Sequence, residues 1–493
     1  MRGLRTSVVA VVAVAVGLAL VAAFAERGSS AARRPPNIVF VITDDLSWNL
    51  VKFMPHVRQM QKQGATFGRY FVTDSLCCPS RASILTGDFP HNTGIITNTG
   101  RYGGFKLFQA RGEERATFAT HLHNLGYTTA LMGKYLNGYV PDRAVDGVVP
   151  YIPPGWDEWD VGGNAYSNYN YLLNENGSLV QYGHDASDYL TDVLAEKGST
   201  FISNAAHEQR PFLLEVATFS PHAPFTPAPR HLADFPRLKA PRNRAFDEPN
   251  VSDKPSWLRF HTALRTTQLS NIDWSYRRRA QSVESVDELL GRLQDALKNA
   301  GQLSNTYIFF TSDNGYHLGE HRLSGGKQTA FETDIRVPLI VTGPGVRRGR
   351  TIKQLASNID LYPTFAKLAG SAAPPTVDGR SLVPLFASTS PRGWRTAVLV
   401  EHHGPDRDVT DPDYPPPQSG NPPTYAAMRT PDAKYVEYVN GEVEYYNLKK
   451  DPFELRNRAG SLGSATRARL HDRLAALVAC KGAEQCWTAA GGR

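Results

Sequence analysis

The sequence contains little cysteine. Only four of its 493 residues are cysteines, and they stand as two pairs at opposite ends of the chain, Cys77 with Cys78 and Cys480 with Cys486. The short separation of Cys480 and Cys486 predicts a disulfide near the C-terminus of an exported protein. Cys77 and Cys78 need another explanation, because adjacent cysteines rarely bond to each other without backbone strain. The finger-like spacing of histidine and cysteine that a structural zinc site requires is missing as well.

A dominant run of positive charge is also missing. The formal net charge of +7 and the pI of about 9.1 would suit an anionic partner, but lysine and arginine do not gather in one stretch. We therefore expect a solvated basic surface and no nucleic-acid partner. With 41% hydrophobic and 20% charged residues, the chain can bury a large core and divide into one large and one smaller domain.

The N-terminus has the pattern of an export signal. Arg2 and Arg5 precede an apolar run over residues 8–21, and an Ala-Phe-Ala sequence ending at residue 25 offers a small-residue cleavage site. Residues 1–25 are therefore predicted to be a cleaved signal peptide, and the protein to be secreted without stable membrane insertion. An uncleaved membrane anchor is the alternative, because the apolar run is near the lower length limit of a membrane span.

The stretch Cys77-Cys78-Pro79-Ser80-Arg81 opens an apolar-periodic run that Gly87 ends. Proline suits the first turn of a helix, so the two thiols are predicted to lie at a helix N-terminus. Unpaired backbone N–H groups and the positive end of the helix dipole meet there, and Arg81 adds a forked positive charge. These features predict a nucleophile beside an anion-binding site.

Polar side chains follow several predicted strands at the point where each strand ends. Asp44-Asp45 follow a buried apolar run over residues 37–43, and Asp313-Asn314 follow another over residues 306–311. Two adjacent carboxylates at the end of a buried strand favour a hard cation such as calcium, whereas an Asx turn or helix cap would explain only one of them.

Two further strands deliver cationic side chains. Strands over residues 127–132 and 212–219 lead to Lys134 and His222. Strands that alternate with helices predict an α/β fold, in which a large and mostly parallel sheet is sandwiched by helices and binds ligands at the carboxyl ends of its strands. We therefore expect the polar residues to meet at one edge of that sheet.

Residues past 384 change in character. Residues 397–401, 425–428, 434–438 and 443–448 are predicted as short antiparallel strands, with a proline-rich loop over 403–423 and a final helix over 465–478. The predicted organisation is therefore a signal peptide, a flexible linker over 26–36, a catalytic domain over 37–390, and a C-terminal subdomain over 391–493 with a small sheet. Residues 150–187, rich in Asn, Tyr and Gly, are interpreted as long loops or a small excursion.

These residues together resemble the type I sulfatases of the alkaline-phosphatase-like superfamily. The family signature, Cys-x-Pro-Ser-Arg followed by a helix, matches Cys77 to Arg81. The resemblance covers nearly the whole mature chain and extends to these further motifs: Thr43-Asp44-Asp45, Gly133-Lys134, Pro221-His222, Ser312-Asp313-Asn314-Gly315, Lys327, Ser357-Asn358-Ile359-Asp360 and Asn447-Leu448-Lys449-Lys450-Asp451-Pro452-Phe453-Glu454-Leu455.

The resemblance implies that Cys77 is not used as a thiol. In the family, a formylglycine-generating enzyme oxidises this cysteine to formylglycine, an aldehyde whose hydrate supplies the nucleophile. Carried over residue by residue, one Ca²⁺ would be bound by Asp44, Asp45, Asp313, Asn314 and the hydrated residue 77. The sulfate would be surrounded by Arg81, Lys134, His222 and Lys327. His222 and Lys327 are the candidates for protonating the leaving oxygen.

One position departs from the family pattern. Many arylsulfatases carry a histidine two places after the lysine of the Gly-Lys motif, where this chain has Leu136. The base that deprotonates the second hydroxyl of the hydrate therefore stays open. Asn137, His317 and His321 are candidate substrate-binding residues, and for the two histidines an ordinary loop role is an equal expectation.

The same departure bears on the substrate. The sequence Gly133-Lys134-Tyr135-Leu136-Asn137 and the Cys-Cys form of the signature are most similar to the N-acetylglucosamine-6-sulfatase branch, which acts on glycosaminoglycan sugars. A sulfated carbohydrate is therefore the expected substrate, with an aryl sulfate as the other possibility. Two alternatives are a phosphonate or phosphate ester hydrolase, which can share the fold and the signature, and a non-catalytic binder of sulfated glycans if Cys77 stays a thiol.

Overall fold

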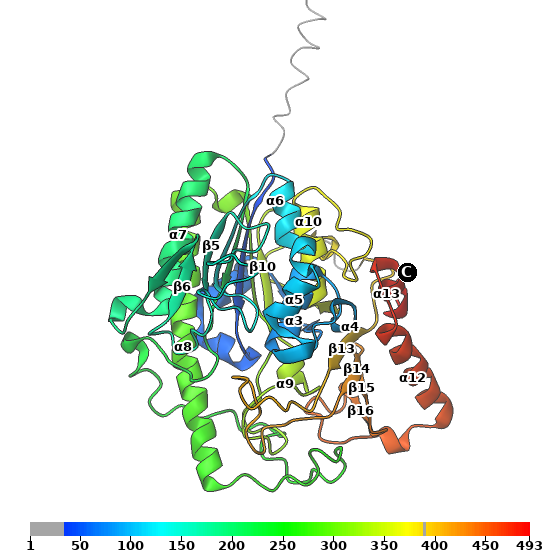
Figure 1. The fold of residues 1–493 in the computed structure, drawn as a ribbon. Coiled ribbons are helices and arrows are strands. Elements are labelled where there is room, and N and C mark those ends of the chain that lie inside the picture. The colour runs from blue at the N-terminus through cyan, green and yellow to red at the C-terminus, as the bar shows by residue number, and fades with distance from the viewer. Residues whose placement is uncertain (1–33, 388–390) are drawn as a thin grey trace, which may run out of the picture. The chain divides into compact units, whose positions relative to one another are not determined.

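A ten-stranded sheet forms the centre of the unit that spans Pro36–Arg493 (Figure 1). The computed structural model describes residues 34–387 and 391–493, so the predicted signal peptide and most of the predicted linker lie outside the described residues. In order across the sheet, its strands are β11 (Arg350–Ile352), β2 (Ala65–Phe67), β10 (Leu339–Thr342), β9 (Thr306–Ser312), β1 (Asn37–Thr43), β8 (Phe212–Ala217), β4 (Thr128–Lys134), β5 (Glu158–Gly162), β6 (Leu172–Glu175) and β7 (Ser178–Gln181). The described helices include none that is long and apolar enough to span a membrane.

The middle of this sheet is parallel, as predicted. Strand β1 pairs in parallel with β8 and with β9, and β4 pairs in parallel with β8 and β5. Thr43 at the end of β1 lies opposite Ser312 at the end of β9. This register brings Asp44 and Asp313, the next residue of each strand, to the same edge of the sheet.

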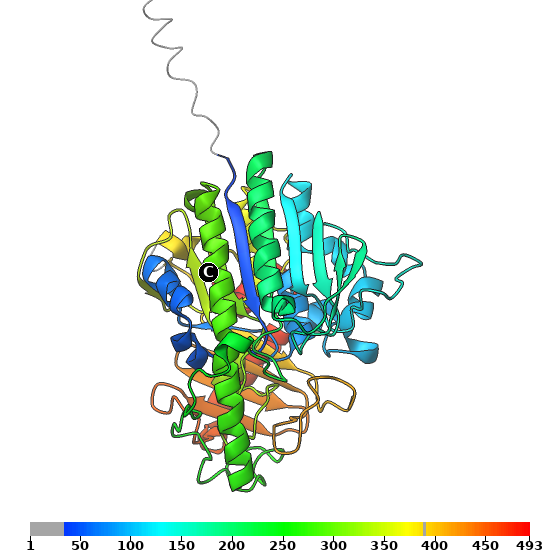
Figure 2. The same cartoon turned by 90° about the vertical axis from the view of Figure 1, so that its left-hand side faces the viewer.

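Helices cover both faces of the sheet. Apolar side chains of β1 alternate between the faces because successive residues of a strand point in opposite directions. Val39 and Val41 pack with residues of α2 (Pro55–Gln63), α7 (Leu190–Glu208) and α8 (Thr266–Asn299), and Figure 2 shows α7 and α8 running along this side of β1.

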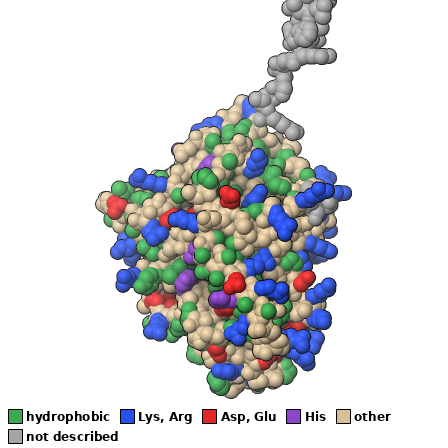
Figure 3. Space-filling view, turned by 90° about the vertical axis from the view of Figure 1, so that its right-hand side faces the viewer, with side chains coloured by type: hydrophobic (Ala, Val, Ile, Leu, Met, Phe, Trp, Pro, Cys, Tyr) green, Lys and Arg blue, Asp and Glu red, His purple; other side chains and the backbone are tan. Residues whose placement is uncertain are grey.

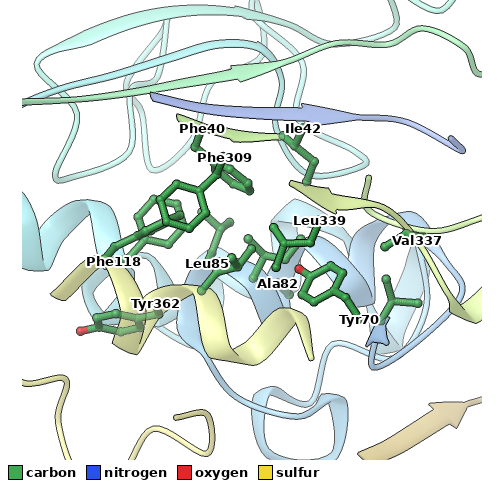
Figure 4. Close-up of a cluster of buried hydrophobic side chains, with 14 of the residues drawn as sticks. Phe40, Ile42, Tyr70, Ala82, Leu85, Phe118, Phe309, Val337, Leu339 and Tyr362 are labelled. Carbon is green, nitrogen blue, oxygen red and sulfur yellow. The ribbon is translucent and has the colours of Figure 1, made fainter. Parts of the chain in front are cut away.

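The opposite face packs against α3 (Cys77–Thr86), α6 (Phe118–Asn124) and α10 (Leu361–Leu368). Figure 4 shows Phe40 and Ile42 of β1 facing Leu85 of α3 and Phe118 of α6 across this core. The apolar side of α3 is therefore fixed against the central strand. Shorter elements complete this part of the chain: α4 (Pro90–Thr93), α5 (Gly104–Ala110), α9 (Glu332–Ile335), α11 (Pro384–Ala387), β3 (Tyr70–Phe71) and β12 (Ala356–Ser357).

The structure corrects the interpretation of residues 150–187. This stretch is not only loop, because it contains β5, β6 and β7, which continue the large sheet. Its strands have only four or five residues, too few to show a clear period. Asn176 and Gly177 join β6 to β7 with positive φ of 50° and 90°, the conformation that makes Asn-Gly a hairpin turn.

The C-terminal subdomain contains the expected antiparallel sheet. Its strands, in order, are β13 (Val398–His402), β14 (Tyr425–Arg429), β15 (Ala433–Tyr438) and β16 (Val443–Asn447). Helices α12 (Ser464–Val478) and α13 (Ala483–Ala489) follow, and a disulfide joins Cys480, just after α12, to Cys486 of α13. On the face that Figure 3 shows, Lys and Arg side chains are spread among other residues rather than gathered in one stripe.

Candidate active site

Cys77 is the first residue of α3, and all ten residues of this helix are buried. The helix ends at Gly87, whose φ of 76° gives the left-handed conformation that favours glycine. The thiol Sγ lies 3.1 Å from Oδ1 of Asp44 and 2.9 Å from Nζ of Lys327. Burial raises the pKa of the Cys77 thiol well above its ordinary value, and the nearby carboxylates of Asp313 and Asp413 raise it further. The unmodified side chain is therefore a neutral thiol and a weak nucleophile.

The ends of β1 and β9 bring four oxygen-bearing side chains together. Asn314 Nδ2 donates to Oδ1 of Asp45 at 2.6 Å, and the backbone N–H of Asp45 donates to Oδ1 of Asp313 at 3.2 Å. Asp44, Asp45, Asp313 and Asn314 are each at most 1% exposed. The amide oxygen Oδ1 of Asn314 is buried with no hydrogen-bond partner. An unsatisfied oxygen among three buried carboxylates is a donor set that fits a hard divalent cation.

Cationic side chains surround these carboxylates. Nζ of Lys134 lies 2.5 Å from Oδ2 of Asp44, and Nε of Arg81 lies 2.8 Å from Oδ2 of Asp313. Burial would raise the pKa of Asp44, but the positive charges of Lys134, His222 and Arg81 together outweigh burial and hold this pKa below its ordinary value. For Asp313, burial and the neighbouring charge of Asp44 prevail and raise the pKa.

Lys327 and His222 are two further cationic side chains of this cluster, and both contact Asp413. Nζ of Lys327 lies 2.7 Å from Oδ1 of Asp45. Both ring nitrogens of His222 face an acceptor, the carbonyl of Ala223 at 2.7 Å and Oδ1 of Asp413 at 2.6 Å. Burial lowers the pKa of His222, but the surrounding carboxylates outweigh burial and raise it above its ordinary value. The geometry and the charges both favour an imidazolium that donates from both nitrogens.

Two members of this cluster were missed by reasoning from the sequence. Asp413 lies in the proline-rich loop over residues 403–423, where no periodicity or motif marks one aspartate among several. Tyr166 comes from the stretch interpreted as loops; its ring lies 4.4 Å from the ring of His222 and 5.0 Å from Nζ of Lys134. Its aromatic neighbours in the sequence are numerous, so no signal distinguished it.

The three candidate substrate-binding residues have different surroundings. Asn137 lies near the cluster, with Nδ2 3.5 Å from the hydroxyl of Tyr166 and Oδ1 buried without a partner. His317 is buried between Asp334, at 2.9 Å, and the carbonyl of Ser419, at 2.8 Å. His321 is bound to Glu248 at 2.7 Å and stacks on Phe331. The partners of the two histidines favour structural roles, and Leu136 is buried in the apolar core.

A cavity of about 180 Å³ adjoins the cluster. Leu76, which precedes the thiol, and Asn98, whose Oδ1 accepts from the backbone N–H of Cys78 at 2.9 Å, line it on one side. His403, Asp406 and Arg407 line it from the proline-rich loop. A cavity that offers both hydrogen-bond donors and acceptors suits a hydroxylated ligand.

The sequence matches two protein-family models over most of its length. The family model described as "Sulfatase" matches residues 36–371, and the model "N-sulphoglucosamine sulphohydrolase, C-terminal" matches residues 319–479. The human protein named N-acetylglucosamine-6-sulfatase is 37% identical over 483 residues, covering 92% of this chain and 86% of the relative. A Drosophila melanogaster relative named as an extracellular sulfatase homologue is 36% identical over 392 residues, covering 77% of this chain and 34% of the relative.

Solved structures show the same fold. One, described as a complex with its substrate D-glucosamine-2-N,6-O-disulfate, is similar with a TM-score of 0.70 and 26% identity, covering 90% of this chain and 97% of the other. A phosphonate monoester hydrolase from Silicibacter pomeroyi has a TM-score of 0.67 at 22% identity, covering 89% and 94%. The second likeness is one of fold alone.

Proposed function

The chain belongs to the sulfatase family, and from this premise we propose that it hydrolyses 6-O-sulfate esters of N-acetylglucosamine-type sugars. Members of the family are sulfuric ester hydrolases that generally use formylglycine and a metal ion. The observation that carries the proposal for this chain is the convergence of Cys77, at the start of α3, with buried cationic side chains and buried carboxylates. The human relative and the substrate complex supply the sugar class.

Cys77 is the residue that a formylglycine-generating enzyme would mature. Its buried, neutral thiol is a weak nucleophile as it stands, whereas the hydrate of formylglycine supplies a hydroxyl oxygen at the same position. Lys327, 2.9 Å from Sγ, is placed to orient that oxygen. The helix N-terminus and Arg81 favour the negative charge of a sulfate beside it.

The metal ion is proposed to be one Ca²⁺. Asp44, Asp45, Asp313 and Asn314 would hold it, because they offer hard oxygen donors and Asn314 keeps a buried oxygen with no partner. When bound, the ion supplies positive charge that polarises the sulfate ester.

The cationic side chains are assigned two roles, stabilisation of negative charge and donation of a proton. Arg81, Lys134 and Lys327 stabilise the negative charge that shifts among the sulfate oxygens during sulfur–oxygen cleavage. His222, with protons on both ring nitrogens, is the donor we assign to the leaving sugar oxygen. The group that acts as base at residue 77 is not Leu136, whose side chain carries no titratable atom.

The cavity beside Leu76 and Asn98 would hold the sugar. It is lined by His403, Asp406 and Arg407, which pair naturally with the hydroxyl and amide groups of an N-acetylated sugar. We place the enzyme outside the cell. The extracellular naming of the Drosophila relative and the disulfide between Cys480 and Cys486 support this, since disulfides persist in oxidising compartments.

The proposal is tested with a panel of esters. The matured enzyme is expected to release sulfate from N-acetylglucosamine 6-sulfate with a higher kcat/KM than from an aryl sulfate or from a matched phosphate ester. Turnover of the aryl ester alone would refute the sugar assignment. Preferred turnover of the phosphate or phosphonate ester would instead place the chain with the phosphonate hydrolases that share its fold.

A further inference from the structure

Asp413 reaches the candidate active site from the C-terminal subdomain. It lies on the loop between β13 and β14, and its side chain is only 3% exposed. The loop is held there by hydrogen bonds from Asn98 Nδ2 to Oδ2 of Asp413, at 2.7 Å, and from Gln328 Nε2 to its backbone carbonyl, at 3.2 Å. Asp413 is therefore held in place through one carboxylate oxygen, Oδ2, and through its backbone carbonyl.

The other oxygen of this carboxylate contacts two of the proposed sulfate-binding groups. Oδ1 of Asp413 lies 2.8 Å from Nζ of Lys327 and 2.6 Å from Nε2 of His222. Burial would raise the pKa of Asp413, but Lys327 and His222 outweigh it and hold this pKa well below its ordinary value. The negative charge of Asp413 therefore contacts Lys327 and His222, the same cationic side chains that would bind the substrate anion.

Such a charge repels anions according to their own charge. A sulfate ester carries one negative charge, whereas a phosphate monoester carries close to two above its second pKa of about 6. The repulsion from Asp413 is therefore about twice as large for the phosphate ester. The two esters are otherwise similar in shape, with a tetrahedral centre and the same leaving alcohol.

We propose that Asp413 determines specificity for singly charged esters, by placing a buried carboxylate beside Lys327 and His222 that disfavours doubly charged phosphate monoesters. This inference rests on the proposed sulfatase site, and it adds a residue from the C-terminal subdomain to it. It also gives the loop over residues 403–423 a role in choosing the reacting group as well as in lining the cavity.

The test compares three esters of one alcohol at pH 8. N-acetylglucosamine carries at O6 a sulfate, a phosphate, or a methylphosphonate, which is singly charged like sulfate but centred on phosphorus. In Asp413→Asn, the kcat/KM for the phosphate relative to the sulfate is expected to rise by about tenfold or more. The ratio of methylphosphonate to sulfate is expected to stay within a factor of about two, because both are single anions.

The matched control is Asp411→Asn. Asp411 is on the same loop and buried, and its Oδ1 accepts from Asn98 at 3.2 Å, so the variant removes one nearby carboxylate that does not contact Lys327 or His222. It is expected to leave the ratio of phosphate to sulfate near the wild-type value. Asp413→Glu, which keeps the charge, is expected to do the same.

Several outcomes would overturn the inference. An unchanged phosphate to sulfate ratio in folded Asp413→Asn would do so, and so would an equal rise for the phosphate and the methylphosphonate. If Asp413→Asn bound all three esters more tightly by the same factor, the carboxylate would only compete with every substrate and would not discriminate between them. The preference for phosphate over sulfate can also be measured without turnover, from the dissociation constants of the two esters in a Cys77→Ala background. Asp413→Ser serves there as a second variant that lacks the carboxylate. Wild-type protein that hydrolyses no sulfate ester would refute the proposed function itself.

Discussion

Nζ of Lys134 lies 2.5 Å from Oδ2 of Asp44, and the two side chains are 3% and 0% exposed. Burial lowers the pKa of Lys134, but Asp44, with smaller contributions from Cys77 and Tyr166, outweighs burial and raises this pKa well above its ordinary value. Lys134 ends β4 and Asp44 follows β1, so the pair ties together two strands that are separated by β8. The ion pair thus holds the ends of β1 and β4 together and neutralises one buried carboxylate of the site.

Removing this ammonium should affect both stability and activity. In Lys134→Met, Asp44 loses a buried partner, which typically costs about 3–5 kcal/mol of unfolding free energy. Loss of one charge that stabilises the transition state is expected to lower kcat/KM by about 10²–10³-fold. Denaturant unfolding and sulfate release measure the two effects.

The control for this variant is Lys197→Met. Lys197 pairs with Asp160 at 3.1 Å and with Glu175 at 2.7 Å, so its removal also takes a partner from a buried carboxylate and is expected to lower stability. It lies outside the cluster, and its activity is expected to stay near wild type. Full activity in Lys134→Met would contradict the role of Lys134 at the sulfate.

Cys77 is expected to be an aldehyde in active protein from its native source. The peptide that contains it should have a mass lower than the sequence predicts, because sulfur is replaced by oxygen and two hydrogens are lost. Cys77→Ala should lose all measurable turnover, whereas Cys78→Ala, the matched change one residue along, should retain it. An unmodified thiol at residue 77 in fully active protein would contradict the assignment.

A divalent cation is expected to stabilise the fold as well as the reaction. Chelation should abolish turnover, and added Ca²⁺ should raise the Tm of the chelated protein, because a ligand that binds only the folded state stabilises it. In Asp313→Ala this Ca²⁺-dependent rise should disappear.

The control is Asp287→Asn, which removes a buried carboxylate that accepts from the backbone of His56 and Val57 at the start of α2. This variant should lower Tm and keep the response to Ca²⁺. A Ca²⁺ response that persists in Asp313→Ala, or activity that survives chelation, would argue against the proposed ligands.

Most of the cluster was predictable because of how parallel sheets are built. Asp44, Lys134, His222 and Asp313 each follow an apolar strand, and carboxyl ends of parallel strands share one edge. The structure places all four within one network of contacts. Local sequence sufficed here, since each residue's position depends on the strand directly before it.

Asp413 was not predictable, because its position depends on contacts far along the chain. Asn98 and Gln328, which anchor it, are separated from it by 315 and 85 residues. Its own loop is rich in proline and aspartate and has no period. For the same reason His317 was ambiguous: only the fold reveals Asp334 and Ser419 as its partners.

His402, at the end of β13, is a fully buried histidine that should make stability sensitive to acid. The carboxylate of Asp74 lies 3.7 Å from Nδ1, and the charge of Asp406 and the backbone of Pro422 favour the imidazolium without outweighing burial. Burial raises the pKa of Asp74 itself well above its ordinary value, so its support for an imidazolium is small. Burial lowers the pKa of His402 to about 4.

The sign of the resulting pH dependence follows from proton binding. Between pH 6.5 and 4 the unfolded chain binds a proton at His402 that the folded chain does not, so stability falls as the pH falls. The full loss below pH 4 is on the order of 3 kcal/mol. His402→Phe, which preserves the ring packing against Tyr425, should flatten the unfolding free energy over this range, measured by denaturant titration at each pH. His471→Phe, on a side chain 59% exposed, should leave the slope unchanged, and an equal slope in His402→Phe would locate the acid sensitivity in other groups.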